Sequence, residues 1–313
     1  MLAVILLGCS LLIGVLDMDC RNIFAKKYSK TFADGVLFTG VTQLIVVVAL
    51  GLMGGFALPS GTAMLLSAAY ALVAITNYIS FFEAVKTGPL FATVILNTTI
   101  GCTIPCIAGV FIWKESISIS QLLGTLMMFA SVVMITKWEK GEKPNMRWFV
   151  MTMVSSITCG GYGIVQQAFN RYCPGSENTS FLFYAFLMAS IMTFVYLLLI
   201  KLRSNDVKNQ AALQTSGEGG GESKKEFITW KPVGVALLLI IAVGLLCFVD
   251  NVNNLWLVGQ FPAVVFFIIC DGGRMVLNTV VSAVFFHEKI SKIQTLGVLA
   301  GVLAVVLISG ALG

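Results

Sequence analysis

Charged residues are scarce in this sequence, at 11% of 313 residues, whereas hydrophobic residues make up 58% of it. Soluble domains are about 25% charged, so this chain has too little polar surface to face water on all sides. The mean hydropathy of +0.92 agrees with this conclusion. The net charge of +5 does not indicate a nucleic-acid partner, because the basic residues are spread over short connectors. We therefore expect the lipid bilayer to surround most of the protein.

Histidine is almost absent, and the cysteines form no metal-binding pattern. His287 is the single histidine, and none of the eight cysteines belongs to a CxxC pair, which zinc and redox sites commonly need. The sequence has no Walker-type phosphate loop and no serine, histidine and aspartate set that would indicate a hydrolase. We therefore expect no metal, no cofactor and no enzymatic activity. The cysteines are interpreted as free thiols packed between helices.

Long apolar runs occur in place of the alternating pattern of a membrane β-barrel. About 20 apolar residues carry a helix across the hydrocarbon core, so we expect an all-α integral membrane protein with ten transmembrane helices. The first run has neither a basic leader nor a clear cleavage site, and it is interpreted as a span rather than a signal peptide. The predicted spans are 2–24, 33–56, 62–84, 88–112, 119–137, 147–170, 179–201, 232–257, 260–285 and 292–311.

The sequence repeats itself at a shift of 173 residues. The stretch "WKESISISQLLG" at Trp113–Gly124 matches "FHEKISKIQTLG" at Phe286–Gly297, with Glu, Ile, Ser, Gln and Gly in register. Pro89 and Pro262 are matched at the same shift. Matches between polar residues are informative in so apolar a chain, so we interpret the pattern as an internal repeat and not as a coincidence between two helix starts.

The repeat divides the chain into two halves of five spans each. We predict a first five-helix repeat at 1–137, a connector at 138–146 and a second repeat at 147–313, which includes a flexible polar loop at 203–231. Because five is an odd number, the second half starts on the opposite side of the membrane. Inverted repeats of this kind are typical of secondary transporters, whose substrate site lies between the halves near the midplane.

The repeated unit resembles the EamA-type repeat of the drug/metabolite transporter superfamily. The likeness is carried by the "WKE" turn followed by "SISQLLGTLMMFASVVMI", and by the second copy "FHEKISKIQTLGVLAGVLAVVLIS". The resemblance covers nearly the whole chain. It implies a basket of helices around a central cavity that opens alternately to each side, with helices one to four and six to nine lining it. In the repeated turns, Glu115 and Glu288 are interpreted as caps of helix N-termini, with a proton relay as the alternative.

Ionisable residues inside spans are costly and usually functional. Asp17, Asp250 and Asp271 fall within predicted spans, and Arg274 lies three residues after Asp271, on the same helix face. Asp271 and Arg274 form either a structural ion pair or a substrate site in which Arg274 engages a carboxylate or phosphate. Asp17 and Asp250 are candidates for ion coupling. Neutral polar residues complete the expected substrate site, namely Asn77, Tyr78, Asn97, Tyr162, Gln166 and Asn254.

The distribution of basic residues predicts an orientation. Connectors that follow odd-numbered spans contain or adjoin 17 of the 20 Lys and Arg residues. The positive-inside rule then assigns these connectors to the cytoplasm and both termini to the outside. The resemblance implies cytoplasmic termini instead, so the orientation stays open at this point.

We therefore expect a secondary transporter in the cell membrane that moves a small polar metabolite, such as an amino acid, sugar or nucleoside, by alternating access with possible proton coupling. The alternative is a membrane-embedded binding or scaffold protein that has this fold but no flux. A monomer or a homodimer is expected, and no nucleic acid.

Overall fold

The computed structural model describes residues 2–29, 31–87, 90–135, 145–173, 175–214, 233–285 and 291–309. Every regular element in these ranges is helical. The elements are α1 (Leu2–Lys27), α2 (Phe32–Leu52), α3 (Gly61–Thr87), α4 (Leu90–Phe111), α5 (Ile119–Ile135), α6 (Met146–Tyr172), the short η1 (Gly175–Glu177), α7 (Asn178–Gln214), α8 (Val233–Val258), the continuous segment α9 (Ala263–Phe267), η2 (Ile268–Gly272) and α10 (Gly273–Phe285), and α11 (Lys292–Ser309).

Local hydrogen bonds define several helix starts. Thr31 and Asp34 form a reciprocal capping box at the start of α2. At the start of α5, the Ser118 amide donates to Gln121 Oε1 (3.0 Å), and the Gln121 amide donates to Ser118 Oγ (3.2 Å). The start of α11 has the same two bonds between Ser291 and Gln294, at 2.9 and 3.2 Å. The repeated serine and glutamine are therefore two copies of one capping device.

The helices follow the predicted spans, with two differences. Helix α7 continues to Gln214, so residues 203–214 are helical where the sequence predicted a flexible loop, and the rest of that loop lies outside the described residues. The ninth helix is interrupted by the π-helical turn η2, which widens the helix at Ile268–Gly272. Pro89, His287 and Glu288, which the sequence analysis singled out, also lie outside the described residues.

Within the described residues, seven helices are long and apolar enough to cross a membrane: Leu2–Arg21, Ala33–Leu52, Gly61–Phe81, Met146–Tyr172, Gly175–Leu202, Gly234–Val258 and Ala263–Val281. Shorter apolar helices occupy Leu96–Phe111, Ile119–Ile135 and Lys292–Ile308. Many large apolar side chains on these helices point outward, as with Leu65 (70% exposed) and Leu238 (66%). Only lipid accommodates such an outer surface, so the chain is a multi-pass membrane protein.

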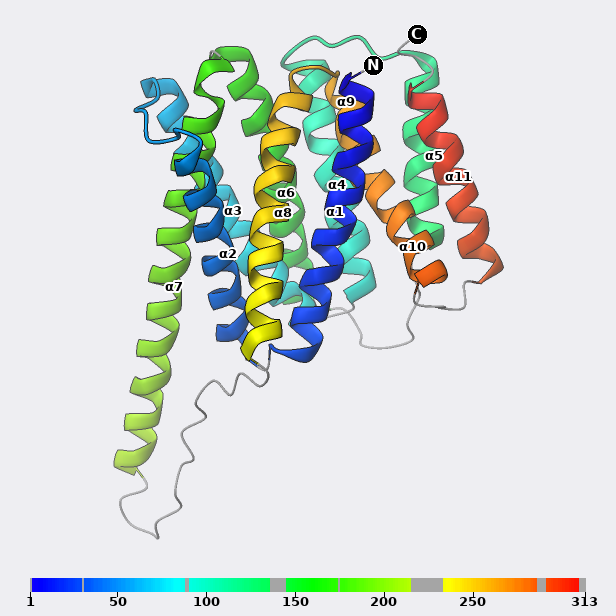
Figure 1. Cartoon of the computed structure of the whole chain (residues 1–313). Coiled ribbons are helices and arrows are strands. Elements are labelled where there is room, and N and C mark those ends of the chain that lie inside the picture. The colour runs from blue at the N-terminus through cyan, green and yellow to red at the C-terminus, as the bar shows by residue number, and fades with distance from the viewer. Residues whose placement is uncertain are drawn as a thin grey trace.

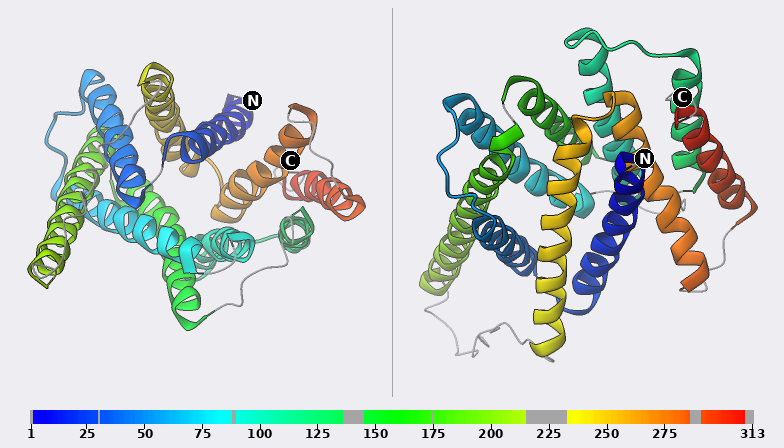
Figure 2. Two further views of the ribbon diagram at one scale, coloured as in Figure 1. Left: turned by 90° about the horizontal axis from the view of Figure 1, so that it is seen from below. Right: turned by 45° about the horizontal axis from the view of Figure 1, so that its top comes forward.

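Consecutive long helices run in opposite directions, and α1 begins at the same end of the bundle at which α11 ends (Figure 1). Helices α5 and α11 pack together at one edge of the bundle, and α2 and α7 pack together at the opposite edge (Figure 2). Between these edges, α1 packs against α8 and α10, while α3 and α4 pack against α6. Residues 263–270 of the ninth segment are buried at the centre of the largest apolar core.

Two glycines bring α5 and α11 into close contact. A Cβ atom on Gly124 would lie 2.6 Å from Ile308 Cγ1, and one on Gly297 would lie 2.9 Å from Ile135 Cγ2. Small residues at such crossings allow helices to pack closely in lipid, where van der Waals contact drives association. The two glycines of the sequence repeat thus meet matching residues on the partner helix.

Candidate functional site

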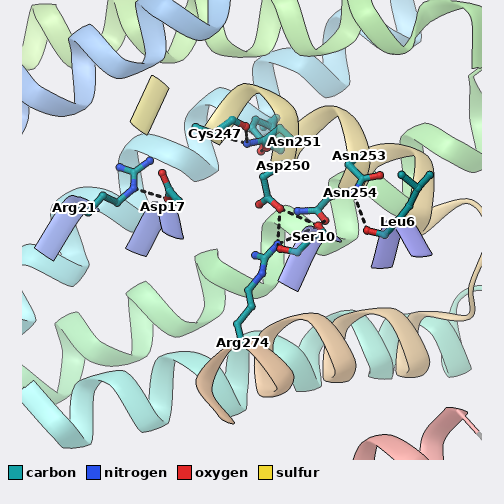
Figure 3. Close-up of polar contacts among 11 residues, drawn as sticks. Leu6, Ser10, Asp17, Arg21, Cys247, Asp250, Asn251, Asn253, Asn254 and Arg274 are labelled. Atoms are coloured by element: carbon teal, nitrogen blue, oxygen red, sulfur yellow. Dashed lines mark hydrogen bonds and ion pairs between the residues drawn. The ribbon is translucent and has the colours of Figure 1, made fainter. Parts of the chain in front are cut away.

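A charged centre joins three helices in the middle of the bundle. Arg274 of α10 donates from Nη2 to Asp250 Oδ1 of α8 at 2.6 Å. The same nitrogen lies 3.3 Å from both the carbonyl oxygen and Oγ of Ser10 in α1. Ser10 Oγ is 2.9 Å from Asp250 Oδ1 and 2.5 Å from Asn254 Oδ1, so its single proton is donated to one of them at a time. Figure 3 shows these side chains converging from α1, α8 and α10.

The path of Arg274 to this centre depends on Gly14 of α1. A Cβ atom on Gly14 would lie 2.2 Å from Arg274 Nε and 2.7 Å from its Cζ, so a larger residue there would displace the guanidinium. The Nε atom is buried and has no hydrogen-bond partner within the described ranges. This nitrogen packs against the backbone of α1 at Gly14, and the guanidinium is thereby held against Asp250.

The expected partnership between Asp271 and Arg274 is replaced by two separate interactions. Arg274 pairs with Asp250, while Asp271 Oδ2 lies 3.5 Å from Cys102 Sγ of α4. Asp271 lies in the π-helical turn η2, where each residue turns the chain by less than the 100° of an α-helix, so the two side chains are offset by more than the roughly 60° of a regular helix. Because η2 and α10 lie between α4 and α1, that offset lets Asp271 face α4 and Arg274 face α1 and α8.

Asp17 forms a second ion pair, within α1. Its Oδ2 atom accepts from Arg21 Nε at 2.7 Å, and the arginine guanidinium lies 5.9 Å from the centroid of the Phe38 ring. The Asp17 pair is adjacent to the charged centre but separate from it (Figure 3). Of the two candidates for ion coupling, only Asp250 therefore belongs to the centre that contains Arg274.

The neutral residues Asn77 and Asn97 form a polar cluster between α3, α4 and α6. Asn77 Nδ2 donates to the carbonyl oxygen of Ser155 at 2.8 Å, and Ser155 Oγ donates to Asn97 Oδ1 at 2.8 Å. Thr158 Oγ1 lies 3.4 Å from Asn77 Nδ2.

Tyr162 belongs to an aromatic group near α8. Its ring lies edge-on to Tyr70 with 5.1 Å between centroids, and Tyr70 donates from its hydroxyl to Asn251 Oδ1 at 2.9 Å. Gln166, on the same helix as Tyr162, is 7% exposed. Tyr78 lies further along α3, near Thr39 of α2.

Sequence reasoning missed the small polar residues that organise both clusters. Ser10 and Ser155 are fully buried and form the bridging contacts, but a single serine in an apolar run gives little signal. The two serines are 145 positions apart, a spacing that a comparison of the chain with itself at a shift of 173 residues does not find.

Glu115 caps a helix other than the one it precedes. Its Oε2 atom accepts from the amide of Ala263, the first residue of α9, at 2.8 Å, and its Oε1 atom is paired with Arg171 at the end of α6. Helix α5, which follows Glu115 in the chain, is capped by Ser118 and Gln121 instead. The predicted capping role is therefore right in kind, but the capped helix lies 148 residues further along the chain.

No protein-family model matches this chain, and no curated protein matches it. A solved structure described only as "Crystal structure of protein" is similar to it, with a TM-score of 0.67 and 14% sequence identity. The match covers 99% of this chain and 96% of the other. At this identity, the likeness shows a shared fold over the full length.

Proposed function

We propose that this protein is a secondary transporter that moves a small polar metabolite by alternating access, and that it consists of ten membrane crossings in two inverted repeats. The charged centre of Ser10, Asp250 and Arg274 is the observation that carries the proposal. Charged groups at membrane depth are costly, so those that a protein retains usually serve its function. The drug/metabolite transporter superfamily is the proposed family, on the strength of the EamA-type motif.

The packing of the helices supports two related halves. Exchanging α1 with α6, α2 with α7, α3 with α8, α4 with α9–α10, and α5 with α11 converts the contact α3–α6 into α8–α1. It also converts α4–α6 into α10–α1, and α3–α7 into α8–α2, all of which are present. The contacts α2–α7 and α5–α11 are converted into themselves, as expected for pairs that lie on a two-fold axis.

The direction of the helices supports inversion. Helix α1 starts at one end of the bundle and α6 starts at the other (Figure 1). A half with an odd number of crossings has this consequence, which in transporters is associated with a substrate site between the repeats.

The two polar clusters occupy equivalent positions under this exchange. Ser10 and Ser155 are related by 145 residues, and Asn77 and Asp250 by 173. In one cluster Ser155 contacts the Asn77 side chain, and in the other Ser10 contacts Asp250. One cluster is therefore neutral, whereas the other is charged.

The charged cluster differs from the neutral one because a small and a large residue are swapped between equivalent positions. Arg274 lies against Gly14, and its equivalent Gly101 lies against Cys159, with 2.9 Å from a Gly101 Cβ position to Cys159 Sγ. Arg274 of α10 fills the crossing between α1 and α10, whereas Cys159 of α6 fills the equivalent crossing between α4 and α6. This asymmetry favours a substrate with an ionised end for Arg274 and Asp250 and an uncharged polar end for Asn77 and Asn97. Asp250 and Asp17 are the proposed proton-coupling residues.

Flux into proteoliposomes containing the purified chain tests this proposal. Uptake of a radiolabelled amino acid, sugar or nucleoside that saturates, and that is lost in Arg274→Gln, is the expected result. Binding of such a compound without any flux, under both inward and outward pH gradients, would instead favour the scaffold alternative.

A further inference from the structure

A polar pocket lies away from the charged centre, at the end of the bundle where α6 ends and α9 begins. Its volume is about 340 Å³, near the lower limit for small-molecule sites. Three connecting or terminal segments of the chain form it, at the end of α6, between α4 and α5, and between α8 and α9. Its polar lining consists of Glu115, Gln167, Asn170, Arg171 and Gln260.

Gln167 gives the first indication of a ligand. The residue is only 4% exposed and lines the pocket, yet its Oε1 atom is buried without a hydrogen-bond partner among the residues that the structure describes. An unsatisfied buried acceptor costs about 1–3 kcal/mol, so it is normally retained only where something donates to it. The neighbouring Asn170 is not that donor, because its Nδ2 atom donates to the carbonyl oxygens of Gln166 and Leu255.

The backbone before Glu115 gives a second indication. Lys114 has a φ of 55°, in the left-handed region that residues other than glycine seldom adopt. This turn directs the Glu115 carboxylate to both Arg171 and the Ala263 amide. Strained backbone of this kind is found preferentially at functional sites.

The charges of the pocket define the ligand class. One carboxylate (Glu115) and one guanidinium (Arg171) face each other there, and the arginine side chain is 42% exposed and also lies 5.5 Å from the Trp113 ring centroid. An anion would bind Arg171 but lie beside Glu115, and a cation would have the opposite conflict. A zwitterion satisfies both charges, because its carboxylate pairs with Arg171 and its ammonium group pairs with Glu115 and donates to Gln167 Oε1.

We propose that this pocket is a binding site for a small zwitterion of amino-acid size, separate from the charged centre. This binding site does not depend on transport, because it requires only the Glu115, Gln167 and Arg171 side chains.

The experiment uses the full chain in lipid nanodiscs and measures thermal unfolding with each of the twenty standard amino acids, followed by calorimetric titration of any that stabilise it. At least one is expected to raise the Tm. Its N-acetyl derivative, which lacks the cation, and its methyl ester, which lacks the carboxylate, are each expected to bind at least tenfold more weakly. The same loss is expected in Gln167→Leu and Arg171→Gln. Gln167→Glu keeps an acceptor and is expected to retain binding. If Gln167→Leu does not fold, the loss expected in Arg171→Gln decides the test.

Glu177→Gln is the matched control, since Glu177 lies at the same end of the protein, outside the pocket lining, and bonds to Ser60. It is expected to leave the affinity unchanged within twofold. The proposal is overturned if no amino acid binds, or if Arg171→Gln and Gln167→Leu bind as tightly as the parent. Binding that is lost in Asp250→Asn but kept in both pocket variants would assign the ligand to the charged centre, which overturns the pocket while leaving the transport proposal intact.

Discussion

Arg274 Nη2 lies 2.6 Å from Asp250 Oδ1, in an ion pair that connects α10 to α8. The two side chains are 22% and 15% exposed, so both are largely removed from solvent. Ser10 completes the contact from α1. This polar centre thus links three helices, and Asn253 of α8 adds a further bond to α1 by donating from Nδ2 to the Leu6 carbonyl oxygen at 2.9 Å.

Asp250→Asn is expected to destabilise the protein by about 3 kcal/mol, because it leaves the Arg274 charge buried without its partner. Thermal unfolding in nanodiscs measures this loss. The double variant Asp250→Asn/Arg274→Gln removes both charges and is expected to recover most of the stability but not flux. An additive loss of stability in the double variant would show that the ion pair carries no coupling energy.

Gly14→Ala is expected to reduce flux at least tenfold, because the added Cβ would lie 2.2 Å from Arg274 Nε and displace the guanidinium. Gly8→Ala is the matched control on the same helix, since a Cβ there meets nothing within 4 Å. Both variants gain similar helix propensity, so the difference between them reports the contact with Arg274. Equal flux in the two variants would contradict the role assigned to Gly14.

Gln294→Ala is expected to cost about 2 kcal/mol, against about 1 kcal/mol for Gln121→Ala. Both glutamines close the same capping box, but Gln294 Nε2 also donates to the Ile135 carbonyl at 3.1 Å. Chemical denaturation of the two variants side by side measures the difference. Equal losses would mean that the bond from α11 to α5 contributes nothing net.

Glu115→Ala is expected to speed hydrogen exchange in the peptide 259–268 at least tenfold, because the Ala263 amide loses its acceptor and α6 loses its link to α9. Glu115→Gln keeps an acceptor without the charge, and an intermediate rate is expected. Glu177→Ala serves as the control at the same end and leaves this peptide unchanged. Exchange that is unaffected in Glu115→Ala would remove the proposed link.

Helix positions were predictable from the sequence because they depend on local properties. Apolar runs gave the start of α5 at Ile119 and of α11 at Lys292 as the structure has them. The extension of α7 to Gln214 was missed, since polar composition was taken as a sign of disorder.

Partners across helices were less predictable. Asp250, Arg274 and Asn254 were each selected as site residues, yet the pairing of Arg274 with Asp250 depends on how α10 and α8 pack. Glu115 was recognised as a capping residue, but its partners, Ala263 and Arg171, are brought to it only by the tertiary fold. Ser10 was missed because one hydroxyl in an apolar run is usually bonded to its own helix.

The wide turn at Ile268–Gly272 gives the ninth segment a property that a regular helix lacks. It holds one residue more than an α-turn, and each residue of an α-helix advances the chain by about 100° around the axis. If the extra residue moved along the segment, the helix on one side of it would rotate relative to the helix on the other side, while most backbone hydrogen bonds would be kept. Asp271 lies within this turn and Arg274 lies just beyond it. A change of register there would thus give the carboxylate a new neighbour while Arg274 keeps its position, so the segment can change contacts without unfolding.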